Sequence, residues 1–308
     1  MDTKHTIQVN HLKKNYKKVT AIEDINFNVA KGEIFGLIGP DGAGKTSIFR
    51  ILTTLLVPDK GNANVEGYDV VHDYRKIRSL IGYMPGRFSL YLDMTVMENI
   101  EFFATIFGTT IEENYHLIKD IYQQIEPFKD RLARNLSGGM KQKLALSCAL
   151  IHKPSVLVLD EPTTGVDAVS RKEFWEMLVK LKEQGITILV STPYMDEAGL
   201  CDRVGLIQNG RILSIDTPKA ILNNFPKKLL SVRSTNTYQL LQDLRENKNL
   251  HSVYPFGSKI HVTGKEGGLD ASQIKEFLIE RNHEKIEIND ITPTIEDCFI
   301  ELMGEQYE

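Results

Sequence analysis

The pattern of apolar and polar positions predicts buried strands with helices between them over roughly the first 220 residues. Residues 34–38 and 156–159 are short, continuous apolar runs, which are typical of strands buried on both faces of a parallel sheet. Residues 48–55 repeat apolar side chains at helical spacing, and residues 95–108 and 144–150 are also predicted to be apolar helices. We therefore expect an α/β fold in this part of the chain.

The pattern changes after a turn-rich segment at residues 217–228. Four short strands and two helices are predicted in the order β-α-β-β-α-β, followed by a last helix: strands at 229–234, 250–255, 259–263 and 285–291, and helices at 237–247, 271–282 and 293–303. Asp270 and Gln273 are expected to form a capping box at the start of the second helix. This order predicts a small α+β, ferredoxin-like module. We expect domains at 1–222 and 223–308.

Composition narrows the class of protein. A length of 308 residues suggests about two domains, and 42% hydrophobic with 25% charged residues is ordinary for a globular chain. The net charge of −4 argues against a nucleic-acid partner. Cys148, Cys201 and Cys298 lie far apart, which predicts buried thiols in a reducing compartment. No signal peptide and no membrane span are visible, so we expect a cytoplasmic protein.

The apolar run at 34–38 leads into Gly39-Pro-Asp-Gly-Ala-Gly44-Lys45-Thr46, and a helix follows. A strand, a glycine-rich loop and a helix start are the context that a phosphate-binding P-loop requires. The glycines let backbone N–H groups turn toward phosphate oxygens, and the helix N-terminus adds a favourable field. Lys45 is expected to reach the β- and γ-phosphates, and Thr46 to bind Mg²⁺. The candidate ATP-binding residues of this loop are Gly39, Pro40, Asp41, Gly42, Ala43, Gly44, Lys45, Thr46 and Ser47.

The second apolar run ends in Asp160-Glu161-Pro162, at the strand edge where open α/β sheets bind their ligands. Asp160 is a candidate ATP-site residue and Mg²⁺ ligand. Glu161 follows it and is a candidate general base for an attacking water, so Glu161 and Lys45 are the candidate catalytic residues. Acidic residues that merely end a strand are the alternative at this position.

A third motif, Leu136-Ser137-Gly138-Gly139-Met-Lys-Gln-Lys143, opens an apolar helix. Ser137 is a good N-cap, and the two glycines let an anion approach the first amides of the helix. The segment resembles the signature motif of the ATP-binding cassette (ABC) ATPases, and the resemblance covers residues 5 to about 222. It implies a RecA-like core, an antiparallel β patch and a helical subdomain at about 87–150. In that family two domains dimerise head to tail, so Ser137, Gly138 and Gly139 would contact the partner's ATP.

The same resemblance implies that Tyr16 stacks on adenine and that Asp167 lies in a loop that contacts the opposite subunit. It also shows two departures. Gly86 stands where the family has a Gln that touches Mg²⁺ and the attacking water, and Pro193 stands where it has a His that bonds the γ-phosphate. Thr192 and Tyr194 are poor substitutes, because neighbouring residues at a strand end point to opposite sides. We therefore expect intact ATP binding and impaired hydrolysis at this chain's own site.

The amino-acid sequences of these motifs are most similar to those in the first half of tandem ATPases from multidrug efflux systems of the ABC-2 exporter class. This resemblance implies separate ABC-2-type permease subunits, a second ATPase chain or a second copy of this chain, in some systems a membrane-fusion protein, and a place on the inner face of the cell membrane. The apolar loop that contains Arg87, Phe88, Leu90 and Tyr91 is expected to meet the permease. A non-transport ABC ATPase acting on ribosomes or DNA is the alternative, and the signature motif contradicts a kinase or a GTPase.

Overall fold

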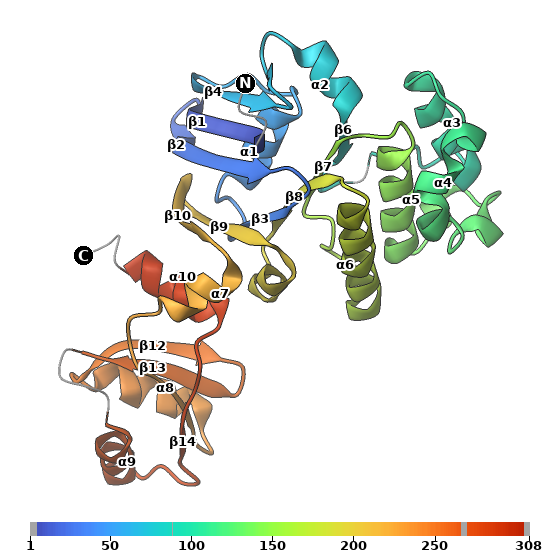
Figure 1. Cartoon of the computed structure of the whole chain (residues 1–308). Coiled ribbons are helices and arrows are strands. Elements are labelled where there is room, and N and C mark those ends of the chain that lie inside the picture. The colour runs from blue at the N-terminus through green and yellow to red at the C-terminus, as the bar shows by residue number, and fades with distance from the viewer. Residues whose placement is uncertain (1–4, 88, 266–269, 305–308) are drawn as a thin grey trace. The chain divides into compact units, whose positions relative to one another are not determined.

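The computed structural model describes residues 5–87, 89–265 and 270–304, and the chain forms two compact units with the boundary between Lys219 and Ala220. Phe88, one of the residues expected to contact a permease, lies outside the described residues. The strands of the first unit are β1 (His5–Tyr16), β2 (Val19–Ala30), β3 (Ile34–Ile38), β4 (Lys60–Val65), β5 (Tyr68–Asp69), β6 (Ile81–Met84), β7 (Val156–Asp160), β8 (Thr187–Thr192), β9 (Arg203–Gln208) and β10 (Arg211–Asp216) (Figure 1). Its helices are α1 (Lys45–Leu52), α2 (Tyr74–Leu80), α3 (Val96–Ile106), α4 (Ile111–Tyr122), α5 (Gly138–Leu150) and α6 (Ala168–Glu183), and α7 (Pro218–Asn223) spans the boundary.

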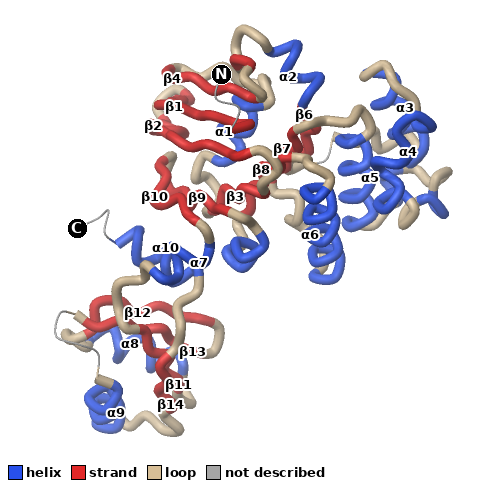
Figure 2. Tube along the Cα trace, in the orientation of Figure 1, coloured by secondary structure: helices blue, strands red, loops and turns tan. Residues whose placement is uncertain are grey.

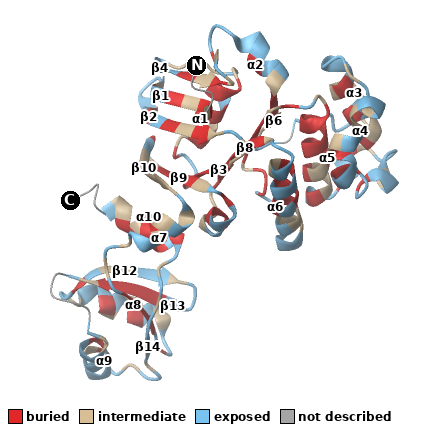
Figure 3. Cartoon of the chain, viewed as in Figure 1, coloured by how far each residue is buried: buried red, intermediate tan, exposed pale blue. Residues whose placement is uncertain are grey.

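The central sheet of the first unit has the strand order β10-β9-β3-β8-β7-β6. The four pairings from β9 to β6 are parallel, and β10 adds an antiparallel edge. Every residue of β3, β7 and β8 is buried, as expected for strands covered on both faces (Figures 2 and 3). The apolar runs at residues 34–38 and 156–159 therefore form the buried strands β3 and β7, as predicted.

A second, antiparallel sheet with the order β2-β1-β4-β5 shares its core with this central sheet. Phe27 on β2 stacks on Phe35 on β3, with ring centroids 5.4 Å apart, and Ile48 of α1 belongs to the same apolar cluster. This confirms the antiparallel β patch, and the α/β fold of a RecA-like core is confirmed with it.

The helical part of the first unit contains α3, α4 and α5. Capping boxes begin α3 at Thr95 and α4 at Thr110, each with a glutamate three residues later. Asn99, fully buried on α3, fastens the preceding loop, because its Oδ1 accepts from Tyr91 N at 2.9 Å and its Nδ2 donates to Tyr91 O at 3.1 Å and Thr95 O at 2.8 Å.

We expect Asn99→Ala to destabilise the protein by about 2–3 kcal/mol, because it leaves buried backbone groups of Tyr91 without partners. Denaturant unfolding measures this change. Asn114→Ala on α4 is a suitable comparison, since Asn114 also bonds a backbone carbonyl, that of Ile151, but is only partly buried. Equal losses for the two variants would contradict the assigned role of Asn99.

The second unit contains β11 (Leu229–Arg233), α8 (Thr237–Glu246), β12 (Leu250–Phe256), β13 (Lys259–Gly264), α9 (Ala271–Glu280), β14 (Glu287–Asp290) and α10 (Ile295–Gly304), whose last residues lie beyond it. Its sheet is antiparallel with the order β12-β13-β11-β14, which is the ferredoxin-like arrangement predicted from the sequence. Leu240 of α8 and Ile274 and Leu278 of α9 form its core with β11 and β13.

One local prediction for this unit was wrong. Asp270 does cap α9, but its side chain accepts from the backbone N–H of Ser272 at 2.8 Å rather than forming the capping box with Gln273. An aspartate is short, so it reaches the second amide of the helix as an Asx turn does.

Two expectations from composition can be compared directly with the structure. Cys148, Cys201 and Cys298 are free and buried, as predicted. Among the described residues, no helix has the length and apolar character that crossing a bilayer would require.

Candidate nucleotide site

The predicted site residues converge at the carboxyl ends of four adjacent strands, β3, β8, β7 and β6. The glycine-rich loop follows β3, Pro193 follows β8, Glu161 follows β7 and Gly86 follows β6. Backbone hydrogen bonds join the ends, from Gly39 N to Thr192 O at 3.3 Å and from Glu161 N to Ser191 O at 3.1 Å. Ligands of parallel α/β sheets bind at this edge.

The loop from Gly39 to Gly44 is shaped by close backbone contacts. A Cβ atom at Gly39 would lie 2.0 Å from Ile207 O, and one at Gly44 would lie 2.4 Å from Ala21 O. Gly44 also has a φ of 106°, which disfavours other residues, and it serves as the N-cap of α1. The loop therefore brings free amides to the first turn of a helix, which suits an anion.

Lys45 is the first residue of α1 and is only 3% exposed. Its Nζ donates to Gly39 O at 2.8 Å and to Pro40 O at 3.0 Å, and lies 3.2 Å from Glu161 Oε1. The ammonium is thus held over the loop by carbonyls and one carboxylate, so the two candidate catalytic residues are in direct contact.

Asp160 is 2% exposed at the end of β7, and its Oδ1 accepts from Ser191 Oγ at 2.6 Å. The same hydroxyl accepts from the backbone N–H of Glu161 at 2.9 Å, where Glu161 has a φ of 51° in the left-handed region. A positive φ is uncommon for a glutamate and turns its side chain away from the strand direction. Ser191 therefore fixes both acidic residues.

Tyr83 on β6 lies near this carboxylate. Burial, together with the negative charge of Asp160, raises the pKa of the Tyr83 hydroxyl to about 12. The phenol consequently stays protonated at neutral pH and adds no charge of its own beside Asp160.

Tyr16, at the end of β1, is 41% exposed, and its hydroxyl lies 3.2 Å from Ser47 Oγ on the first turn of α1. The structure thus places the hydroxyl of this exposed aromatic side chain beside the first turn of α1, which follows the loop. The remaining loop residues, Asp41 and Gly42, are exposed and Ala43 is buried.

Gly86 and Pro193, the two residues that depart from the expected motifs, also border the site. A Cβ at Gly86 would lie 3.2 Å from Asp160 O, so this residue borders the acidic strand end. Pro193 has no side-chain donor. Of its neighbours, Thr192 is fully buried with Oγ1 accepting from Tyr194 N at 3.0 Å, and the ring of Tyr194 lies under the Arg171 guanidinium at 4.9 Å. The Tyr194 ring is thus engaged with Arg171, and the Thr192 hydroxyl is buried and accepts from the adjacent backbone.

Ser137 and its glycines begin α5, where Ser137 Oγ accepts from Met140 N at 3.3 Å, as predicted for an N-cap. A Cβ at Gly138 would lie 3.3 Å from Gly165 O, and one at Gly139 would lie 2.4 Å from Ser170 Oγ. Among the described residues, the atoms nearest to these two glycines belong to the segment around Asp167 and not to the loop at 39–44.

Asp167 caps α6, with its carboxylate accepting from Val169 N, Ser170 N and Ser170 Oγ. These hydrogen bonds, led by that from the Ser170 backbone, lower the pKa of the Asp167 carboxyl. Gln142 links the same region to the acidic strand end, because its buried Nε2 donates to Pro162 O at 2.8 Å.

Sequence reasoning missed Ser191 and Gln142. A serine at the end of an apolar strand run was a usable signal, since a buried hydroxyl needs a partner. Nothing in the sequence indicated that Gln142 would face inward from an otherwise apolar helix.

The arrangement suits a nucleoside triphosphate with its magnesium ion. No cluster of three or more His, Cys, Asp or Glu side chains able to hold a metal occurs among the described residues. Mg²⁺ in phosphate-transfer sites is held by one or two protein oxygens and by the phosphates themselves, so Thr46 and Asp160 are a sufficient protein contribution.

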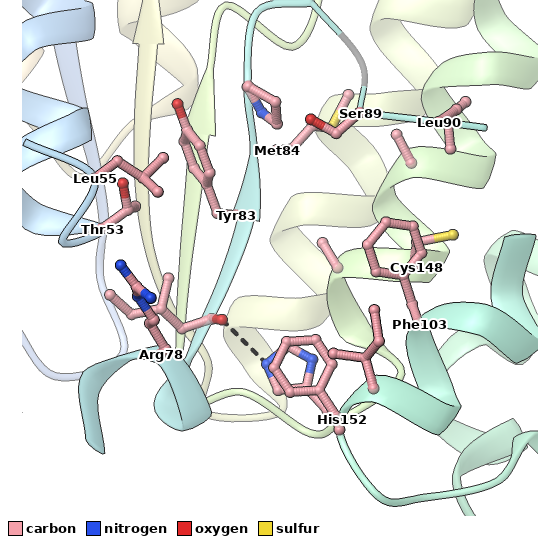
Figure 4. A pocket seen from close by; sticks show the side chains of 16 residues that line it. Thr53, Leu55, Arg78, Tyr83, Met84, Ser89, Leu90, Phe103, Cys148 and His152 are labelled. Atoms are coloured by element: carbon pink, nitrogen blue, oxygen red, sulfur yellow. Dashed lines mark hydrogen bonds between the residues drawn. The ribbon is translucent and has the colours of Figure 1, made fainter. Parts of the chain in front are cut away.

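An apolar pocket of about 450 Å³ lies between the sheet edge at β6 and the helices α3 and α5 (Figure 4). Its lining is mostly carbon and includes Ile81, Met84, Leu90, Phe103, Ile106 and Phe107. Ile106 is 59% exposed, which is unusual for a large aliphatic side chain next to other apolar ones.

The fold and this site define a P-loop nucleotide-binding protein. A comparison with protein families matches residues 22–164 to the ABC transporter family. The chain is 37% identical over 305 residues to a probable multidrug ABC transporter ATP-binding protein, YbhF, of Escherichia coli, covering 97% of this chain and 52% of that protein. It is 33% identical over 313 residues to Nod factor export ATP-binding protein I of Rhizobium sp., covering 99% of each.

Solved structures of ABC transporter ATP-binding proteins are also similar to this chain. CbiO1 of Clostridium perfringens, part of an ABC transporter complex, superposes with a TM-score of 0.64 at 27% identity, covering 72% of this chain and 92% of that one. The dimeric ATP-binding cassette MJ0796 with ADP and Pi gives 0.63 at 25% identity, covering 68% and 98%.

The chain therefore belongs to the ABC transporter ATP-binding proteins, as the signature motif predicted. ATP is the nucleotide of this family. The chain spans about half the length of YbhF.

Proposed function

We propose that this chain is the ATP-binding and ATP-hydrolysing subunit of an ABC-type exporter whose permease chains are separate. The observation that carries the proposal is the meeting of the P-loop, Asp160 and Glu161 at one sheet edge in a chain that also carries the signature motif. Similarity over at least 97% of this chain to proteins named for multidrug transport and for Nod factor export favours export. Residues 1–222 form the nucleotide-binding domain and 223–308 an accessory domain.

In this proposal backbone amides at the end of the loop and in the first turn of α1 bind the phosphates, and Lys45 exchanges its contacts with Gly39 and Pro40 for phosphate oxygens. Tyr16 stacks on adenine. Thr46 and Asp160 would hold Mg²⁺, which neutralises phosphate charge when it is bound. Glu161, released from Lys45, accepts the proton of the attacking water.

The partner contacts follow from the same site. Ser137, Gly138 and Gly139 begin a helix whose amides suit an anion, and the two glycines lie close to Gly165 and Ser170 in the segment of Asp167. We infer that this surface meets the ATP of a second ATPase chain, or of a second copy, on the inner face of the cell membrane. Copurification of the tagged chain from membranes, with identification of the partners, tests the assembly.

The pocket of Figure 4 is the proposed seat of a cytoplasmic segment of the permease. It is apolar, it is open at Ile106, and it is bounded by the loop of Leu90 and Tyr91 that the sequence singled out. Within this loop, Tyr91 packs edge-on against Phe102 at 4.5 Å and remains 47% exposed.

We expect Ile106→Arg to reduce the permease retained on the purified chain at least about tenfold, because a charge would have to be buried in an apolar seat. Ile279→Arg on α9 is the matched control, since Ile279 is 56% exposed but lies on the second unit. Crosslinking from Leu90→Cys to the permease gives an independent readout. Full retention by Ile106→Arg together with no adduct would contradict the docking site.

A further inference from the structure

His152, two residues after the end of α5, is one of the polar side chains that line the pocket (Figure 4). Its Nε2 lies 3.1 Å from Ile81 O, and the ring of Phe107 stacks flat on the imidazole with centroids 3.7 Å apart. A carbonyl oxygen only accepts hydrogen bonds, so Nε2 must carry the proton in this contact.

The state of the other ring nitrogen follows from this assignment. Burial lowers the pKa of His152 and outweighs the opposing effect of the Ile81 bond, so the imidazole is neutral at physiological pH. A neutral imidazole with its proton on Nε2 has a lone pair on Nδ1. Nδ1 is therefore a hydrogen-bond acceptor.

This acceptor has no partner among the residues that the structure describes, although the atom is buried. The other titratable groups that line the pocket do not supply one. Arg78 donates to Thr54 through Nε at 2.8 Å, and burial raises the pKa of both the Tyr83 hydroxyl and the Cys148 thiol, which stay neutral. Buried acceptors are almost always paired, so a missing donor is informative.

We propose that His152 Nδ1 is the polar anchor of this pocket and accepts a hydrogen bond from a hydroxyl or carboxamide side chain on the permease segment. The inference rests on the proposed docking at this pocket and adds which kind of permease segment binds there. The pocket would bind an apolar segment that carries a neutral hydrogen-bond donor. A carboxylate at this position is rejected, because it offers no proton to the lone pair.

The test uses the complex purified from membranes through a tag on this chain. His152→Gln keeps a donor for Ile81 O and removes the imidazole acceptor, and His152→Phe keeps the stacked ring and removes both nitrogens. We expect each to lower permease retention about threefold to tenfold, the effect of one lost hydrogen bond, with ATP affinity unchanged. His116→Gln, at an exposed position on α4, is the matched control and should retain the permease fully.

A second readout is the ¹⁵N resonance of Nδ1 in histidine-labelled protein, which should move upfield only in the assembled complex. Wild-type retention by both His152 variants, or an unshifted Nδ1 resonance in the complex, would overturn the anchor. If Ile106→Arg still loses the permease in that case, docking at the pocket stands and only the hydrogen bond is wrong. If Ile106→Arg also retains it, the docking proposal itself fails.

Discussion

Lys45→Ala is expected to weaken ATP binding by about a hundredfold or more. The ammonium is buried at the mouth of the loop and would form two charge-assisted hydrogen bonds with phosphate oxygens, each contributing about 1.5–3 kcal/mol. Titration calorimetry with Mg-ATP measures the loss. An unchanged dissociation constant would show that the nucleotide binds elsewhere.

Two controls separate this effect from misfolding. Lys172→Ala removes a lysine that is 80% exposed on α6 and should leave ATP affinity unchanged. Lys45 also pairs with Glu161, so Glu161→Gln should be measured beside it. That variant keeps the ammonium and should retain most of the affinity, whereas loss of binding in both variants with a lowered melting temperature would indicate a disturbed loop.

The fold was predictable because local patterns and the global arrangement agree. The apolar runs ending at Gly39 and Asp160 are typical of strands covered on both faces, and β3 and β7 are wholly buried. In the second unit the turn residues and helical stripes gave the order of elements, and Ile274 and Leu278 lie in its core as expected. The error at Asp270 concerns one hydrogen bond, which depends on side-chain length rather than on pattern.

The candidate site was less predictable where it depends on contacts across the chain. Ser191 holds Asp160 from a neighbouring strand, and no local spacing connects the two residues. The pairing of Lys45 with Glu161 likewise depends on β3 and β7 flanking β8, which sequence order alone does not reveal. No sequence motif pointed to His152. Its environment comes from β6 and α3, far from it in sequence.

The purified chain alone is expected to bind ATP and to hydrolyse it very slowly, despite Glu161. Gly86 and Pro193 offer no side-chain donor to the attacking water or to the γ-phosphate, and the loss of one such donor costs about 10²–10³ in rate. The full burial of Thr192 and the stacking of the Tyr194 ring on Arg171 favour this expectation. Phosphate release by the isolated chain measures it.

If this chain pairs with a different ATPase chain, this expectation predicts an assembled transporter with one competent and one weak ATP site. In a head-to-tail dimer, Ser137 completes the partner's site, whereas Glu161 serves this chain's own impaired site. If the partner is a different ATPase chain with a complete site, Ser137→Arg should reduce transport and ATP turnover of the complex about a hundredfold, because it places a bulky cation against the partner's nucleotide. Glu161→Gln should reduce both only about twofold, since its own site acts mainly as a clamp that holds ATP.

The comparison of these two variants in the same complex distinguishes the asymmetric assembly from a homodimer. In a homodimer every site contains both Ser137 and Glu161, so the two substitutions should abolish turnover equally. Ser170→Ala is a control for local disturbance, because Ser170 packs against Gly139 and bonds Asp167 without being placed at either nucleotide. Robust hydrolysis by the purified single chain, abolished by Glu161→Gln, would contradict the asymmetric assembly, since it would mean that other groups replace the missing Gln and His within this chain's own site.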